Sequence, residues 1–178
     1  MFNFEREFSA ESNLVVSQAA KQSAEQQQRD VYESHRHRTF SLAFYMTGNE
    51  VEAEEILTIT FVRAFQQQER PDAFAVDSAL IQELSERFPL RNEESPAVLV
   101  PGAGLNHRNV RRPDLEMAVR NLPANERLLF LLREVEGYTA AMISRLLDIP
   151  ETQVVRSCFS ARIRLHQVLA EQARTEAA

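Results

Sequence analysis

The hydrophobic positions in the last third of the chain recur at helical spacing. Apolar side chains follow a helical period over residues 140–147, and Thr139 precedes this run as a suitable N-cap. Asp148, Ile149 and Pro150 interrupt the pattern. A longer amphipathic run follows, and its apolar face consists of Val154, Cys158, Ala161, Leu165 and Leu169. Two helices joined by a tight turn, the second carrying arginines, are typical of a helix-turn-helix.

The first half of the chain also has helical periodicity. Apolar residues between 31 and 46 mark one helix, which Gly48 and Asn49 end. The next helix begins at the acidic residues 50–55, which suit the positive end of a helix dipole. A further periodic segment spans residues 78–88. We therefore predict an all-α protein.

Composition shifts divide the chain into four parts. Residues 1–30 form a polar N-terminal extension, rich in Gln, Ser, Ala and Glu, whose composition fits either a helix or a frayed leader. Residues 31–88 form one small helical domain, and residues 114–172 form the helix-turn-helix domain. Between them, residues 89–113 contain four Pro and two Gly within PLRNEESPAVLVPGAGLNHRNVRRP, which indicates a linker. Its apolar run at residues 97–100 fits docking on either domain.

Composition narrows the class of protein. The 178 residues are 44% hydrophobic, which is enough for a packed core, and no apolar run approaches the ~20 residues that span a membrane. The N-terminus lacks the pattern of a secretion signal, and a single cysteine suits a reducing cytoplasm. The net charge of −6, gathered in the first half, is unfavourable for a DNA-binding protein that acts alone. Delivery to DNA by a large partner would remove that difficulty.

The C-terminal block resembles region 4 of sigma-70 factors, especially the small extracytoplasmic-function (ECF) type. The matching residues follow the family's order and spacing: Leu122, Pro123, Glu126, Arg127, Gly137, Met142, Ile143, Leu147, Ile149, Pro150, Val154, Ala161, Arg162 and Leu165. This resemblance implies recognition of a −35 promoter element by the second helix. Its polar face gives the candidate DNA-binding residues, namely Gln153, Arg156, Ser157, Ser160 and Arg164. Arg156 can bond a guanine edge with two hydrogen bonds, and Gln153 an adenine.

The recognition helix also carries a second apolar stripe. Val155, Phe159 and Ile163 recur at i, i+4 and i+8, beside the core face. Three apolar residues in line favour cover by the first domain, by the linker or by a protein partner. In the family, basic residues usually occupy the positions of Val155, Ser157 and Ser160. The resemblance therefore implies weaker −35 binding, because this helix carries fewer positive charges.

Residues 31–65 resemble sigma region 2, which docks on core RNA polymerase in that family. The matches include Tyr32, Arg36, Arg38, Leu42, Ala43, Thr47, Gly48, Ala53, Glu54, Glu55, Phe61, Arg63, Ala64 and Phe65. The polymerase-binding candidates implied by this match are Glu54, Glu55, Thr58 and Arg63. The family's Gln-Glu pair falls on Thr58 and Ile59, which departs from the pattern of polymerase contact.

The promoter-melting segment of the family has no close counterpart. The chain contains no Trp, and DAFAVDSALIQELSERFPLRNEE replaces the aromatic and basic pattern that captures the −10 element. Binding flipped bases needs positive charge and aromatic platforms. We predict instead that Asp77, Glu83 and Glu86 present an acidic surface where DNA should lie.

We therefore expect an ECF-like sigma factor that binds core polymerase and promoter DNA and answers to an anti-sigma factor. One alternative is a sigma-like regulator that binds polymerase, a sigma factor or an anti-sigma factor without opening promoters. Another is a dimeric DNA-binding regulator that uses its C-terminal half alone. The chain has no nucleophile–base set, and His35 and His37 lack the i, i+4 spacing of a zinc pair. We predict no enzymatic activity, no metal and no cofactor.

Overall fold

The computed structural model describes residues 4–68, 70–90 and 110–175, and the side chains of residues 21–68, 70–90 and 110–172. Helices are the only regular elements in these ranges, in agreement with the predicted all-α fold. The N-terminal half contains α1 (Phe4–Thr47), α2 (Glu50–Gln67) and α3 (Ala73–Arg87). The C-terminal half contains α4 (Arg112–Arg120), α5 (Ala124–Phe130), the π-helical η1 (Leu131–Val135), α6 (Ala140–Leu147) and α7 (Glu151–Thr175).

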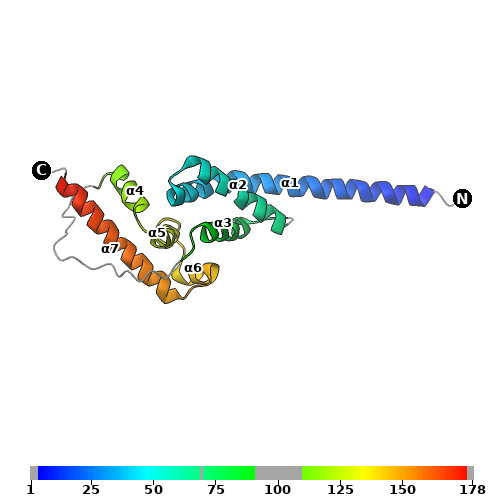
Figure 1. Cartoon of the computed structure of the whole chain (residues 1–178). Coiled ribbons are helices and arrows are strands. Elements are labelled where there is room, and N and C mark those ends of the chain that lie inside the picture. The colour runs from blue at the N-terminus through cyan, green and yellow to red at the C-terminus, as the bar shows by residue number, and fades with distance from the viewer. Residues whose placement is uncertain (1–3, 69, 91–109, 176–178) are drawn as a thin grey trace.

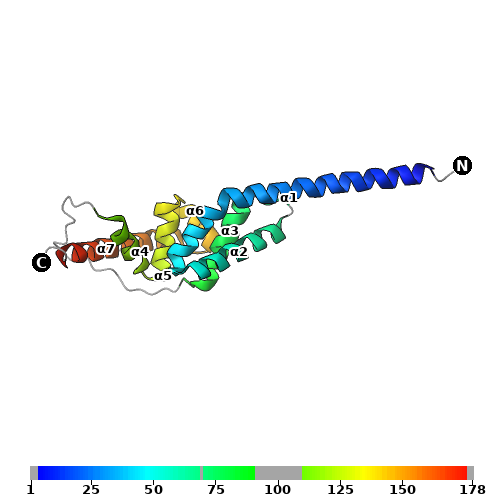
Figure 2. The ribbon, with the colours of Figure 1, turned by 90° about the horizontal axis from the view of Figure 1, so that it is seen from above.

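The helix α1 continues through the predicted boundary at residue 31. Its 44 residues contain neither Gly nor Pro, so nothing in the sequence interrupts the helix before Gly48. The first part of α1 extends away from the other helices in two perpendicular views (Figures 1 and 2). Of the two possibilities for the N-terminal extension, the structure therefore shows a helix over the residues that it describes.

Local sequence signals explain the ends of the N-terminal helices. Gly48 has a φ of 72°, and its N–H donates to the carbonyl of Phe44 at 2.8 Å, which closes α1. The side chain of Asn49 then accepts a hydrogen bond from the N–H of Val51 at 2.9 Å and caps α2. Asp72 caps α3 in the same way through the N–H of Ala75. The third helix therefore begins at Ala73 rather than at the predicted Ser78.

The two halves share one hydrophobic core. Ile56 and Leu84 of the N-terminal half lie in the same buried cluster as Leu128, Ile143 and Val154 of the C-terminal half. All five side chains are essentially inaccessible to solvent. A second, smaller cluster lies between α2 and α3. The predicted linker lies largely outside the described residues, as do the apolar run at 97–100 and the Gly-containing segment that follows it.

Candidate nucleic-acid interface

The helix-turn-helix forms where the sequence predicts it. The Thr139 hydroxyl accepts a hydrogen bond from the N–H of Met142 at 3.2 Å and caps α6. Asp148 adopts a left-handed conformation with a φ of 51°, and the Ser144 hydroxyl donates to the carbonyl of Ile149 at 2.6 Å. These contacts fix the three-residue turn, after which α7 begins at Glu151. The predicted core face of α7 is buried along its whole length from Val154 to Leu169.

The five candidate DNA-binding residues divide into three groups. Arg156 is exposed on α7, with no hydrogen bond or ion pair to any described residue. Gln153 and Ser157 flank it and are half-buried. Ser160 and Arg164 are also half-buried, and both contact the carboxylate of Glu126 on α5. Arg156 is therefore the best placed of the five to contact a ligand from solvent.

Glu126 explains why the other end of this face is less available. Its carboxylate is buried, with 7% of the residue exposed. The Ser160 hydroxyl donates to it at 2.8 Å, and Arg164 Nε lies 3.0 Å from the second oxygen. Ser160 and Arg164 thus join α7 to α5 within the C-terminal half. In the sequence, Glu126 was identified only as one of the residues that match the family pattern. Its contacts with Ser160 and Arg164 of α7 were not predicted.

The second apolar stripe on α7 is only partly covered. Ile163 is buried, with 9% of its surface exposed, whereas Val155 and Phe159 are 48% and 57% exposed. Val155 and Phe159 lie one helical turn apart, and Arg156 sits next to Val155 in the chain. The exposed part of the recognition helix thus presents Arg156 beside two apolar side chains.

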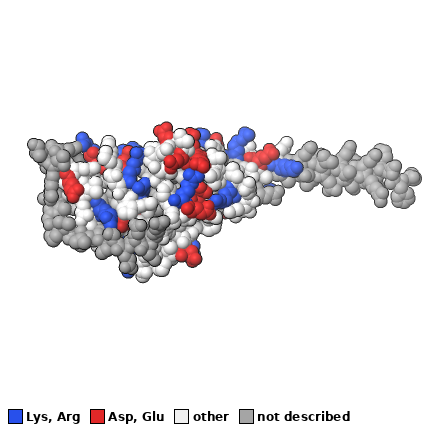
Figure 3. Space-filling view, viewed as in Figure 1, with Lys and Arg blue, Asp and Glu red and all other residues white. Residues whose placement is uncertain are grey.

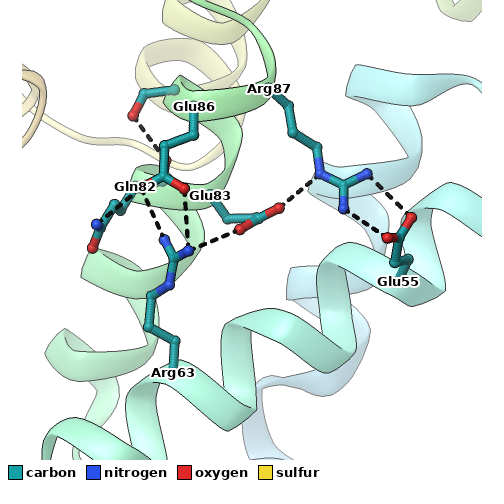
Figure 4. Close-up of polar contacts among 7 residues, drawn as sticks. Glu55, Arg63, Gln82, Glu83, Glu86 and Arg87 are labelled. Carbon is teal, nitrogen blue, oxygen red and sulfur yellow. Dashed lines mark hydrogen bonds and ion pairs between the residues drawn. The ribbon is translucent and has the colours of Figure 1, made fainter.

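The polymerase-binding candidates on α2 also separate by environment. Glu54 and Thr58 are exposed, and the Thr58 hydroxyl donates back to the carbonyl of Glu54 at 2.9 Å. Glu55 is paired with Arg87 of α3 at 3.2 Å. Arg63 lies 3.2 Å from Glu83 and 3.1 Å from Glu86. Figure 4 shows Glu55 and Arg63 reaching across from α2 to α3 as part of one network.

This network also changes the expected charge of the α3 surface. Glu83 is 5% exposed and lies between Arg63 and Arg87, which it contacts at 3.2 Å and 2.7 Å. Glu86 stays at the surface but is paired with Arg63. Asp77 is bound by Arg38 at 2.5 Å. The expectation of a bare acidic surface is therefore wrong, because each of these carboxylates has a cationic partner within the chain. Figure 3 accordingly shows acidic and basic side chains interspersed on this side of the molecule.

Arg127 has a structural role that the sequence did not reveal. Its guanidinium donates to the carbonyls of Met46, Arg120 and Leu122 at 2.7, 2.5 and 3.0 Å. Burial lowers the pKa of this guanidinium below its ordinary value, and the nearby charge of Arg120 contributes. Because Met46 lies at the end of α1, Arg127 joins the N-terminal half to α5. Only the Glu-Arg pair at residues 126–127 marked this position in the sequence.

Cys158 behaves as a small core residue. Its side chain is 3% exposed, and the thiol donates weakly to the carbonyl of Leu129 at 3.5 Å. Burial raises the pKa of the Cys158 thiol above its ordinary value, which disfavours the reactive thiolate.

The residues that the structure describes contain no group of three or more His, Cys, Asp or Glu side chains arranged to hold a metal ion. None of their helices is both long and apolar enough to cross a membrane.

The chain is similar to known proteins in its C-terminal half and in its fold. Residues 112–165 match the family described as sigma-70, region 4. No curated protein matches the chain. The fold is similar to that of the sigma factor RpoE from Bartonella quintana, in its co-crystal structure with the anti-sigma factor NepR. That likeness has a TM-score of 0.59 and 16% sequence identity, and it covers 79% of this chain and 95% of the RpoE chain. The match thus identifies a sigma-70 region 4 in the C-terminal half, and the likeness to RpoE shows a shared fold.

Proposed function

We propose that the chain is a sigma factor that binds core RNA polymerase and directs transcription initiation through −35 recognition by its helix-turn-helix. The observation that carries this proposal is the region 4 match over residues 112–165, which spans a fully formed helix-turn-helix with Arg156 exposed. The protein works in the cytoplasm and catalyses no reaction itself.

The charge of the chain supports delivery by polymerase rather than independent DNA binding. A net charge of −6 repels the phosphate backbone, and most arginines of the α2–α3 surface are occupied by carboxylates. Non-specific affinity depends on releasing counterions from DNA through free cationic side chains. A complex with polymerase supplies that attraction, so the chain needs only to contribute specificity.

Exposed α2 side chains give the most direct candidate for polymerase contact. Glu54 and Thr58 lie one turn apart on the solvent side of α2, whereas Glu55 and Arg63 are turned toward α3. The polymerase surface is therefore centred on Glu54 and Thr58. Glu55 and Arg63 support it by fixing α2 against α3.

A partner of the anti-sigma class is consistent with the comparison. The RpoE structure holds an anti-sigma factor. In this chain, the exposed Val155 and Phe159 give an apolar surface of the kind that a protein partner covers.

The same two residues favour a second candidate function. Apolar side chains on a recognition helix contribute little to phosphate or base-edge hydrogen bonding, although they can touch a thymine methyl group. A sigma-like regulator that binds polymerase or a sigma/anti-sigma partner, without opening promoters, would use this surface for protein contact.

Fluorescence anisotropy with a labelled fragment from upstream of the protein's own gene tests the proposal. The chain alone, core polymerase alone and the mixture are compared at a fixed salt concentration, because affinity depends strongly on salt. We expect specific binding only in the mixture, weakened roughly 5- to 150-fold by Arg156→Ala if one base contact is lost. Binding of the chain to core polymerase with no gain in DNA specificity would favour the regulator instead.

A further inference from the structure

The side of α7 that faces solvent differs from the polar face that the sequence predicts. Of the five candidates on the predicted face, only Arg156 is exposed, and the other four are half-buried. The residues that are exposed between 151 and 162 lie instead on a neighbouring side of the helix, at about 100° per residue, with Val155 and Phe159 near its middle. The members of this side, which we call the exposed face, are Glu151, Thr152, Val155, Arg156, Phe159 and Arg162.

Packing against α5 explains this shift. The buried carboxylate of Glu126 contacts Ser160 at 2.8 Å and Arg164 at 3.0 Å, so it covers the side of α7 that carries these two residues. The core face of α7 is buried at the same time, which fixes the rotation of the helix about its axis. Val155 and Phe159, one helical turn apart, therefore stay exposed.

Cationic side chains accompany the apolar pair. Arg156 and Arg145 of α6 are exposed, and neither has a carboxylate partner in the part of the chain that the structure describes. Arg162 is also exposed and pairs with Glu134 at 2.6 Å. Residues 140–162 contain three Arg against one Asp and one Glu, although the whole chain has a net charge of −6. The exposed face therefore has an apolar centre and a positive margin, which suits a ligand that is apolar inside and negative at its edges.

The major groove of DNA has this combination of properties. The groove admits a helix, phosphates line its edges, and the 5-methyl group of thymine is the apolar group that the base edges present there. Val155 and Phe159 lie four residues apart, or about 6 Å along the helix, which corresponds to roughly two base-pair steps of ~3.4 Å. Each side chain can therefore reach a methyl group on a different base pair while Arg156 bonds a guanine edge.

The size of the apolar centre favours DNA over a protein as its ligand. A stable protein interface buries about 800 Å² on each partner. The apolar centre consists of two exposed side chains, since Ile163 is buried, and two side chains match two thymine methyl groups. Resting on the proposed function, we propose that Val155 and Phe159 read thymine 5-methyl groups beside a guanine that Arg156 binds. The promoter element that α7 recognises then contains thymines within about two base pairs of that guanine.

Selection from random DNA tests this reading. The full chain in complex with core RNA polymerase is mixed with duplexes that carry a randomised segment, and the duplexes retained by the complex but not by core polymerase alone are sequenced. We expect a guanine with thymines close to it. Val155→Ala and Phe159→Ala should each lose the preference for thymine at one position and keep the guanine, whereas Arg156→Ala should lose the guanine and keep the thymines. Met117→Ala, at an exposed apolar position on α4, is the matched control and should select the parent sequences.

A change in the DNA alone provides a second measurement that does not depend on the folding of a variant. The selected duplex is synthesised with deoxyuracil in place of thymine at one position at a time, which removes the methyl group and keeps the base pair. We expect the parent complex to bind roughly fourfold more weakly for each methyl group lost, as for one buried methyl-sized group. In Val155→Ala or Phe159→Ala, the uracil at the position read by that residue should change affinity less than about twofold, because the contact is already absent.

The outcomes separate this reading from the proposed sigma function. Selected sequences without thymine, or a parent complex that binds the uracil duplexes as tightly as the thymine duplex, would refute the methyl reading and leave the sigma function intact. Full uracil sensitivity in both Val155→Ala and Phe159→Ala would refute it as well, because other residues would then contact the methyl groups. A chain that binds core polymerase but selects no sequence would contradict the sigma function itself, and the methyl reading with it.

Discussion

Arg164 Nε lies 3.0 Å from the carboxylate of Glu126, so an arginine on the predicted DNA-reading face is held inside the C-terminal half. Ser160 contacts the same carboxylate. Arg156, two turns earlier on α7, has no such partner among the described residues. Two arginines that one helical face groups together thus have different roles, one in packing and one available to a ligand.

Stability measurements distinguish these roles. Arg164→Ala leaves the buried Glu126 with the Ser160 hydroxyl as its remaining donor, and we expect a loss of about 1–3 kcal/mol in the free energy of unfolding. Arg156→Ala, at an exposed position, should change it by less than about 0.5 kcal/mol. Urea denaturation followed by circular dichroism measures both. Equal stability of the two variants would contradict the assigned roles.

The difference between Arg156 and Arg164 also shows what the sequence could and could not predict. Helical periodicity identified the core face of α7 from Val154 to Leu169, because burial on an amphipathic helix repeats with the helical period. It could not identify Glu126 as the partner of Arg164, because that contact depends on how α5 packs against α7. The predicted start of this helix at Ser78 is five residues too late, because apolar periodicity alone does not include the cap at Asp72.

The acidic residues of α3 give a second example. From the charge of single residues, Glu83 and Glu86 were predicted to form an acidic surface where DNA should lie. Both carboxylates pair with Arg63, which lies 20 and 23 residues earlier in the chain. The sequence could not predict this pairing, because it depends on how α2 packs on α3. The hydrogen bond between Arg38 and Tyr138 could not be predicted for the same reason, since it joins residues 100 positions apart.

The α2–α3 network predicts unequal effects of two matched substitutions. Glu83→Gln removes the charge that Arg63 and Arg87 share in a buried position, and we expect the chain to lose about 1–2 kcal/mol of stability. Glu86→Gln changes an exposed carboxylate whose pKa is lowered mainly by its hydrogen bond from Arg63, and it should leave the unfolding midpoint unchanged. Thermal denaturation of the two variants is the measurement. A larger effect at Glu86 would contradict the burial of Glu83.

Tyr138 should titrate unusually late. Burial and its hydrogen bond to Asp77 raise the pKa of Tyr138 from 10.0 to about 12. Because the folded state favours the neutral phenol, this contribution to stability is complete below pH 10 and is lost as the pH rises toward 12. Phenolate absorbance should show a component near pH 12 that Tyr138→Phe removes. If Tyr138→Phe removes a component near pH 10 instead, the contact with Asp77 is absent in solution.

Cys158 should react slowly with thiol reagents in the folded chain. Burial excludes the reagent and raises the thiol pKa, so both access and thiolate fraction are low. We expect rapid reaction only in denaturant, measured with a chromogenic disulfide. Fast native modification would contradict the packing of α7 on α5.

Promoter-specific transcription tests the proposed sigma function most directly. Purified chain, core RNA polymerase from the source bacterium and a template carrying the region upstream of the protein's own gene are combined in a run-off assay. We predict a transcript of defined length that requires the chain and that Arg156→Ala reduces roughly fivefold or more, as expected for one lost base contact. Binding of the chain to core polymerase with no defined transcript would contradict the sigma function and leave the sigma-like regulator.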